Sequence, residues 1–325
     1  MTTDALTPAL RIAFVGEILI DFTATAGLAF EGHEGGALAN SAIAAARLDQ
    51  PTAFITQLST DLFGERLFDN LVHNGIDTRF VLRSDAPTTL AFVERTPVTN
   101  RYAFYMQGTA DTLWAPALLP VLPDSCRYLH FGSISLLNEP AASRITEFVE
   151  AQKGQRIVVF DPNVRPSMIA DVDDFRRRMQ RWVAACDLLK FSDEDAAVLA
   201  PGLSLHEAAD FFLKPEGQPG PRAVVVTRGG LGATVFRHGR EPIEVSAPQV
   251  EVVDTIGAGD TFAAALSVSL LEQGIEHAQQ VSDLPDDSWR RTLRFAVTAA
   301  ALNCTREGAN PPLRAELRDA LPGAW

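Results

Sequence analysis

The chain has 325 residues, of which 46% are hydrophobic and 21% charged, a composition typical of a globular protein with a large core. A formal net charge of −13 and the lack of basic runs argue against nucleic-acid binding, although a local phosphate site is compatible with them. The chain has no long apolar run, no recognisable signal peptide and three widely spaced cysteines, so we expect a cytoplasmic protein with reduced thiols and no membrane partner.

The first part of the chain contains two polar segments that could contact a ligand. Residues 11–16 are expected to form a buried strand, and Asp21 follows at the end of such a strand where ligands bind in open α/β sheets. Taken alone, Asp21 is better explained as a turn residue. Residues 35–46 form a glycine-to-helix junction, in which Asn40 can donate and accept hydrogen bonds from a hydroxyl-rich ligand. The alternative for this junction is a flexible loop that enters an alanine-rich core helix.

The pattern between residues 88 and 107 differs from the rest of the chain. Residues 90–93 and 101–106 are expected to form the two strands of an antiparallel hairpin. In a chain that otherwise alternates strands and helices, this hairpin indicates an appended sheet that covers a site. Arg101 and Phe104 could reach a ligand from it, but aromatic residues in strands are more often simply packed.

From residue 128 onward, strands and helices alternate, which predicts an α/β fold with a doubly wound, mostly parallel sheet flanked by helices. Each predicted strand is followed by glycines or polar residues. Because the carboxyl ends of parallel strands meet at one edge of the sheet, we expect these residues to share a ligand crevice. They are Asp161, Asn163, Ser192, Asp195 and Thr227, and the turn that follows contains Gly229 and Gly232.

A stretch near the C-terminal end joins a β-branched run at 250–253 to an alanine-rich helix through Gly257, Ala258 and Gly259. The β-branched run predicts the end of a strand. The first turn of a helix offers unpaired N–H groups and the positive end of the helix dipole, so Asp260 lies where a phosphate-like charge would be held. For Gly-x-Gly-Asp alone, a helix cap is the simpler explanation. The polar crevice predicted above favours a catalytic carboxylate instead.

The chain carries two signatures, Gly-Gly-Ala-x-Ala-Asn at 35–40 and Asp-Thr-x-Gly-Ala-Gly-Asp-Thr-Phe at 254–262. Together with segments at 160–165, 190–194 and 304–309, they resemble the ribokinase-like carbohydrate kinases, also called the PfkB family, and within it the bacterial fructokinases. The resemblance extends from about residue 12 to residue 312. It implies a single ribokinase-like kinase domain over residues 1–325, with a small antiparallel β-sheet lid formed by residues 18–34 and 88–108.

The resemblance also implies a reaction, in which the γ-phosphate of ATP passes to a primary hydroxyl of a sugar. Asp260 would be the general base, and the backbone N–H groups of Gly257, Ala258 and Gly259 would form an anion hole. The chain has neither the GxxxxGK[ST] segment of P-loop enzymes nor the protein-kinase motif set, so neither of those mechanisms is indicated.

Matching the family motifs to this sequence assigns the site residues. For the sugar they are Asp21, Gly35, Gly36 and Asn40, with Arg101, Phe104, Asn163 and Arg165 as further candidates. For ATP they are Lys190, Ser192, Thr227, Gly229, Gly232 and Gly259. An acidic residue would organise the water around Mg²⁺, and position favours Asp195 over Glu194. Many relatives also bind K⁺, for which the matching positions are Asp254, Ile256, Asn303 and Gly308. Asn303 stands where relatives often have a smaller residue.

The leading interpretation is a fructokinase that uses ATP and Mg²⁺ to convert D-fructose to fructose 6-phosphate. The same fold with 2-keto-3-deoxygluconate, ribose or a nucleoside as substrate is the first alternative, because the sequence alone does not position the side chains that select the sugar. A non-catalytic sugar-binding regulatory protein is an alternative of another class, and such a protein would commonly lose Asp260. In relatives the lid often pairs two subunits, so we expect a homodimer.

Overall fold

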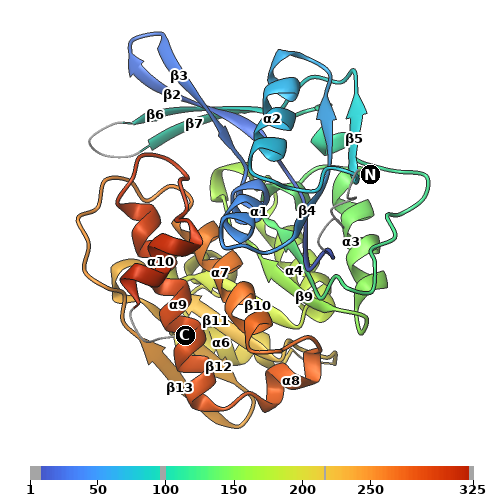
Figure 1. The fold of residues 1–325 in the computed structure, drawn as a ribbon. Helices are drawn as coiled ribbons and strands as arrows, with labels where there is room; N and C mark the ends of the chain where they lie inside the picture. The colour runs from blue at the N-terminus through green and yellow to red at the C-terminus, as the bar shows by residue number, and fades with distance from the viewer. Residues whose placement is uncertain (1–8, 96–99, 216, 322–325) are drawn as a thin grey trace, which may run out of the picture.

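A computed structural model describes residues 9–95, 100–215 and 217–321 and contains a large and a small β-sheet (Figure 1). In the large sheet, nine strands follow the order β13-β12-β11-β10-β9-β8-β1-β4-β5. Neighbouring strands from β5 to β11 are parallel, and β12 and β13 are antiparallel to their neighbours. The prediction of a mostly parallel sheet is therefore confirmed. Its strands are β1 (Ile12–Val15), β4 (Thr52–Ser59), β5 (Val81–Ser84), β8 (Tyr128–Gly132), β9 (Ile157–Asp161), β10 (Leu188–Ser192), β11 (Ala223–Thr227), β12 (Ala233–Arg237) and β13 (Arg240–Val245).

Helices cover both faces of the large sheet, as expected of a doubly wound fold. They are α1 (Ala37–Arg47), α2 (Leu62–His73), α3 (Ala141–Gln152), α4 (Val172–Ala185), α5 (Asp193–Leu199), α6 (Leu205–Leu213), α7 (Ala258–Glu272), α8 (Ala278–Asp283), α9 (Asp286–Cys304) and α10 (Arg314–Ala320). Short 3₁₀ turns form at η1 (Asp111–Leu113), η2 (Ser133–Leu136), η3 (Pro166–Met168) and η4 (Gly229–Leu231). No helix of the described ranges is both long and apolar enough to cross a membrane.

The central strands are short and almost wholly apolar because each of their faces lies in a hydrophobic core. In β1, Ile12 and Phe14 pack in a core with α1, α7 and α9, whereas Ala13 and Val15 pack in a second core with α3, α4 and α6. This alternation follows from the two-residue period of a strand. Helix α7 is buried from Thr261 to Leu271, so its first turn is held firmly at the carboxyl edge of the sheet.

The small sheet has the strand order β3-β2-β6-β7 and projects from the upper left of the molecule in Figure 1. Its strands are β2 (Leu19–Ala26), β3 (Ala29–Gly35), β6 (Leu90–Arg95) and β7 (Asn100–Tyr105). Strands β2–β3 and β6–β7 are antiparallel hairpins, and a parallel pairing of β2 with β6 joins them. The hairpin predicted at 88–107 is confirmed, although its tip at 96–99 lies outside the described residues.

The structure corrects two of the sequence-based expectations. Asp21 does not follow the last residue of β1 at the edge of the large sheet, because residues 19–26 form a strand of the small sheet. Residues 250–253 do not form a strand. Instead, the N–H groups of Val253 and Asp254 donate to the backbone oxygen of Cys304 at the end of α9, and Val253 is 55% exposed. The strand predicted here from β-branched composition is wrong, because this segment has no neighbouring strand to pair with.

Candidate active site

A cleft of about 1080 Å³ opens at the carboxyl ends of the central strands and is also lined by the small sheet. The strand register brings the polar ends together, since Ser192 at the end of β10 is the direct partner of Thr227 at the end of β11. Both of these residues line the cleft with Asn163 and Asp195, which confirms the expected crevice. Asp161, at the end of β9, is instead buried behind the lining.

Most of the site residues expected from the sequence line this cleft. They are Asp21, Gly36, Asn40, Phe104, Asn163, Arg165, Lys190, Ser192, Glu194, Asp195, Thr227, Gly229, Gly232, Asp254, Ile256, Gly257, Ala258, Gly259 and Asp260. Gly35, Asn303 and Gly308 lie close to it in the fold but outside its lining. Arg101 belongs to β7, and its side chain lies outside the described part of the structure.

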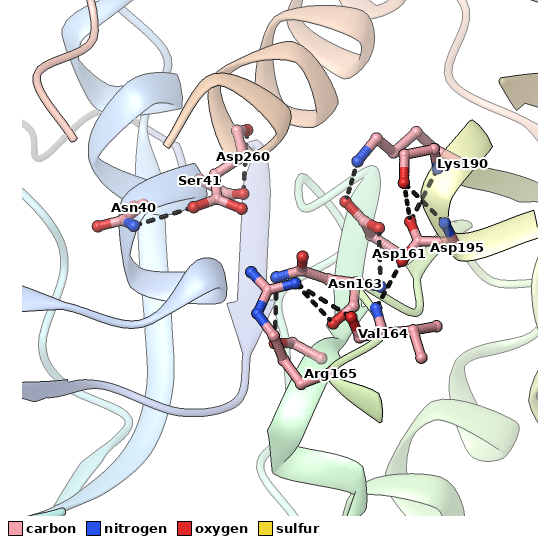
Figure 2. Close-up of polar contacts among 11 residues, drawn as sticks. Asn40, Ser41, Asp161, Asn163, Val164, Arg165, Lys190, Asp195 and Asp260 are labelled. Atoms are coloured by element: carbon pink, nitrogen blue, oxygen red, sulfur yellow. Dashed lines mark hydrogen bonds and ion pairs between the residues drawn. The ribbon is translucent and has the colours of Figure 1, made fainter. Parts of the chain in front are cut away.

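Asp260 lies in the first turn of α7 and points toward α1 (Figure 2). Its Oδ2 accepts a hydrogen bond from Asn40 Nδ2 at 2.9 Å, and its backbone oxygen accepts one from the Ser41 hydroxyl at 3.0 Å. Its Oδ1 has no hydrogen bond to any described residue. Burial raises the pKa of Asp260 above its ordinary value, while the Asn40 hydrogen bond and the charges of Lys190 and Arg165 lower it. The carboxyl group is thus fixed through one oxygen and able to accept a proton on the other.

The turn before α7 presents backbone N–H groups to the cleft. Gly257 is the N-cap residue and has a φ of 74°, a left-handed conformation that glycine adopts without strain. The N–H of Ala258 donates to the Thr255 oxygen at 3.2 Å, whereas in the described structure the N–H groups of Gly259 and Asp260 have no acceptor. Unpaired N–H groups at a helix start, together with the helix dipole, can hold an anion.

The ammonium group of Lys190 lies beside this turn. Its Nζ is 3.2 Å from the position that a Cβ on Gly259 would occupy and 2.7 Å from Asp161 Oδ2 (Figure 2). Burial by itself lowers the pKa of Lys190, but the carboxylates of Asp161, Asp195 and Asp260 more than offset this and raise it. Lys190 is therefore charged at neutral pH and adds a fixed positive charge next to the N–H groups of α7.

On another wall of the cleft, Asp21 extends from β2. Gly35 makes room for it, because a Cβ at Gly35 would lie only 2.2 Å from Asp21 Oδ2. Burial raises the pKa of Asp21 to about 6, and the charge of Arg165 opposes this shift. Arg165 lowers the pKa of Asp260 as well, so its guanidinium acts on both carboxylates. The space between Asp21, Asn40 and Asp260 is consequently rich in groups that can bind hydroxyls.

Asp195 and Ser192, two residues expected at the nucleotide, are bonded to each other. The Ser192 hydroxyl accepts from the Asp195 N–H at 3.0 Å and donates to Asp195 Oδ2 at 2.8 Å, which caps the start of α5. The second oxygen, Asp195 Oδ1, accepts from the Val164 N–H at 2.7 Å. Both oxygens of this buried carboxylate are therefore engaged in holding loops, while the neighbouring Glu194 is exposed on the cleft.

One wall of the cleft is apolar and was not recognised from the sequence. It is formed by Ala247, Pro248, Val250, Val252, Val297, Ala300, Ala301 and Cys304. These residues come from the segment before α7 and from α9. Small apolar residues in a helix have no pattern that distinguishes a ligand wall from a core, so the sequence offered no signal here.

Glu17 is the site residue that sequence reasoning missed most clearly. It lies two residues after the end of β1, is 1% exposed and lines the cleft. Its Oε1 accepts the N–H of Ala37 at the start of α1 at 3.0 Å, and its Oε2 has no hydrogen bond of normal geometry within the described structure. Burial raises the pKa of Glu17 to about 8, and nearby Asp111 and Asp260 add to this while Ser133 opposes it. The signal for Glu17 in the sequence was an acidic residue placed between two apolar runs.

Glu17 is expected to make stability fall as pH rises. The folded protein keeps this proton up to about pH 8, whereas the unfolded chain releases it near the ordinary glutamate pKa of 4.5. Between these values the free energy of unfolding should decrease by about 1.4 kcal/mol per pH unit from this group. Glu17→Gln keeps the acceptor for Ala37 and removes the titration. Urea unfolding at several pH values should show the variant gaining stability over the wild type as pH rises, and parallel curves would contradict the assignment.

Comparison with known proteins agrees with the geometry of the site. The sequence matches the model of the pfkB family carbohydrate kinases over residues 9–316. It is 36% identical over 279 residues to a fructokinase of Rhizobium leguminosarum bv. trifolii, and this match covers 85% of the chain and 84% of that protein. The resemblance inferred from the two motifs is thereby confirmed.

Solved structures give the same result. The fructokinase with bound ATP from Xylella fastidiosa has a TM-score of 0.85 at 28% identity, with 95% of this chain and 98% of that chain covered. A double mutant of the fructokinase from Vibrio cholerae O395, in a form with fructose, ADP and potassium ion bound, has a TM-score of 0.79 at 25% identity, with 96% and 98% covered. The predicted ribokinase-like fold is confirmed. The chain belongs to the pfkB family of carbohydrate kinases and is a sugar kinase.

Proposed function

We propose that the protein is a fructokinase, which converts D-fructose and ATP to fructose 6-phosphate and ADP. The observation that carries the proposal is the position of Asp260, which Asn40 holds at 2.9 Å beside the open N–H groups of α7. The choice of fructose is supported by the relatives, since the Rhizobium and Xylella proteins are fructokinases and the Vibrio protein binds fructose and ADP.

Phosphoryl transfer requires an attacking hydroxyl, a base and groups that neutralise charge on the moving phosphoryl. Asp260 takes the proton of the sugar's primary hydroxyl as the hydroxyl oxygen forms its bond to the γ-phosphorus. The bond from this phosphorus to the β–γ bridging oxygen breaks, and ADP leaves with the electron pair. The open N–H of Gly259, with the ammonium of Lys190, stabilises the phosphoryl oxygens. Gly257 and Ala258 complete the anion hole in this proposal, which requires the Ala258 N–H to turn from the Thr255 backbone oxygen to the phosphoryl.

The sugar lies between the two sheets in this proposal. Asp21 accepts hydrogen bonds from its hydroxyls, and Asn40 both binds the sugar and orients Asp260. Gly35 and Gly36 let the backbone pack closely at this end of the site. A Cβ at Gly36 would lie only 2.7 Å from the backbone oxygen of Glu17. The residues expected around the rest of the sugar are Arg101, Phe104, Asn163 and Arg165.

We further propose that residues 1–325 form one kinase domain and that its small sheet is a lid over the sugar. Leu19, Thr23, Val93 and Phe104 of this sheet line the cleft. They are apolar or weakly polar, as expected of residues that exclude water from a reacting centre.

ATP occupies the end of the cleft farther from Asp21. Its phosphates extend along Lys190, Ser192, Thr227, Gly229, Gly232 and Gly259. The adenine lies against the apolar wall formed by the segment before α7 and by α9. The sugar is not expected to contact this apolar wall. An adenine placed against it gives the wall a ligand of matching chemistry.

Mg²⁺ would neutralise phosphate charge when bound with the nucleotide. The described residues contain no cluster of three or more His, Cys, Asp or Glu side chains that could hold a metal directly. This fits an ion held mainly by phosphates and water. Since both oxygens of Asp195 accept hydrogen bonds, the exposed Glu194 is the better residue to orient that water.

A substrate panel tests the proposed function. Purified protein with ATP and Mg²⁺ is assayed by coupled ADP release with fructose, 2-keto-3-deoxygluconate, ribose and adenosine. Turnover is expected to be fastest with fructose, as judged by kcat/KM. Preference for 2-keto-3-deoxygluconate would overturn the substrate. Sugar binding without turnover of any candidate would support a regulatory protein instead.

We also propose a homodimer formed through the outer face of the small sheet. This face carries Phe22, Phe30, Phe92 and Tyr105, whose rings contact one another at centroid distances of 5.0 to 5.6 Å. Tyr105 is 64% exposed and Phe30 is 37% exposed. Exposed aromatic side chains on a sheet commonly mark an interface. Analytical ultracentrifugation at micromolar concentration should give about twice the chain mass of 35.2 kDa, and a monomer would contradict the proposal.

A further inference from the structure

The residues matched to a monovalent cation do not fit one in this chain. A potassium site of backbone carbonyls requires oxygens that are free to turn toward the ion. Here the Ile256 oxygen accepts a hydrogen bond from Asn303 Nδ2 at 2.7 Å. Asn303 is fully buried, with 0% exposure, so this donor occupies the space beside the carbonyl.

Two further groups with oxygens at this position, the Asn303 carbonyl and the Asp254 carboxylate, also have partners. The backbone oxygen of Asn303 accepts from the Arg306 N–H at 3.2 Å. The Asp254 carboxylate accepts from the Ile256 N–H at 3.1 Å and from the Gly308 N–H at 3.2 Å. An ion entering here would have to displace these protein hydrogen bonds, including the one from the buried Asn303 carboxamide, whose NH₂ group would then lose its partner at a cost.

Asn303 holds both ends of the turn that carries the anion-binding N–H groups. Its Nδ2 bonds to Ile256, just before Gly257, and its Oδ1 accepts the hydroxyl of Thr261, just after Asp260, at 3.4 Å. The orientation of the amide is fixed by chemistry, since the Ile256 oxygen can only accept and therefore faces the NH₂ group. The Asn303 side chain, which extends from α9, thus bridges the two ends of the turn.

We propose that Asn303 is a positioning residue that replaces a monovalent cation in this protein. The partial positive charge of its NH₂ group neutralises the Ile256 carbonyl and fixes the turn whose N–H groups face the phosphoryl. Phosphoryl transfer therefore does not depend on K⁺. This inference rests on the proposed kinase reaction at this turn and concerns how the turn is held rather than which sugar is used.

The test compares salts and variants with whichever sugar of the panel is accepted. Wild-type kcat in potassium, sodium and tetramethylammonium chloride at equal ionic strength should agree within about twofold. Asn303→Ala removes the bridge and leaves space, so kcat should fall at least about tenfold in tetramethylammonium and recover in part with K⁺. Asn303→Asp keeps the shape, removes the donor and adds a negative charge, so its activity should become strongly dependent on K⁺. Asn74→Ala, which removes a carboxamide at the end of α2, should behave as wild type.

A second measurement does not depend on turnover. The melting temperature of each protein with saturating ADP is followed as K⁺ replaces tetramethylammonium. A K⁺-dependent rise is expected for the Asn303 variants and not for the wild type. Activation of the wild type several-fold by K⁺, or a K⁺-dependent rise in its melting temperature, would overturn the inference. Wild-type protein that turns over none of the sugars would count against the proposed function, while the melting experiment would still decide the role of Asn303.

Discussion

Replacing Asp260 with asparagine is expected to lower kcat by about 10²- to 10⁴-fold, the usual contribution of a general base. The asparagine side chain has the same shape and can keep a hydrogen bond to Asn40 by presenting its oxygen. It cannot take the proton of the sugar hydroxyl. Because burial already raises the pKa of Asp260, a neutral side chain at this position should not weaken the fold. The measurement is single-turnover and steady-state ADP release with saturating fructose.

A matched control separates the chemistry from the effect on the helix. Asp174 occupies the same position in α4, the third residue of the helix, and does not line the cleft. Asp174→Asn should retain wild-type kcat. Binding of fructose and ADP, measured by calorimetry, should persist in Asp260→Asn. Near-full activity of Asp260→Asn would show that another group, or water, takes the proton.

The sequence was sufficient to predict the fold and to assign two distant motifs to one site. Parallel strands such as β9 and β11 are continuous apolar runs, because helices cover both faces of the sheet, and such runs are easily recognised. Asn40 and Asp260 are 220 positions apart, yet they form a direct hydrogen bond, as their place in two motifs of one family implied.

Other parts of the site depended on packing that the sequence does not display. Glu17 lies in the cleft because α1 begins directly against it, and its protonation depends on burial that only the folded protein creates. Asp195 has the right position for an ion's water shell, but the cap of α5 engages its Oδ2 and the Val164 N–H engages its Oδ1. In both cases the sequence shows which residue is present but not which groups it contacts in the folded protein.

The expected K⁺ site illustrates the same limit. Four positions matched those of relatives, and the larger side chain at Asn303 was noticed from the sequence. Whether a carboxamide at that position obstructs an ion or replaces it depends on where its NH₂ group points. In the structure the NH₂ group points to the Ile256 carbonyl. The larger side chain is therefore proposed to hold the turn before α7 rather than only to fill space.

Replacing Gly257 with alanine is expected to lower kcat by about 10²- to 10³-fold, the cost of disturbing donors in an anion hole. The residue has a φ of 74°, and an added Cβ would lie 2.7 Å from the Ala309 Cβ and 2.9 Å from the Ala309 Cα. Backbone atoms of the loop around Ala309 cannot yield as a flexible side chain would, so the turn itself must move. That movement displaces the N–H of Gly259 and the carboxylate of Asp260 from the phosphoryl they are proposed to contact.

Gly274→Ala provides the control, because it imposes the same backbone strain without the clash. Gly274 follows the C-terminal end of α7, has a φ of 78° and would have nothing within 4 Å of an added Cβ. Both variants should lose stability by about 1–2 kcal/mol through the left-handed conformation, measured by urea unfolding. The loss of kcat should appear in Gly257→Ala alone. Equal kcat in the two variants would mean that the turn before α7 does not position the phosphoryl, and the anion-hole assignment would then have to be abandoned.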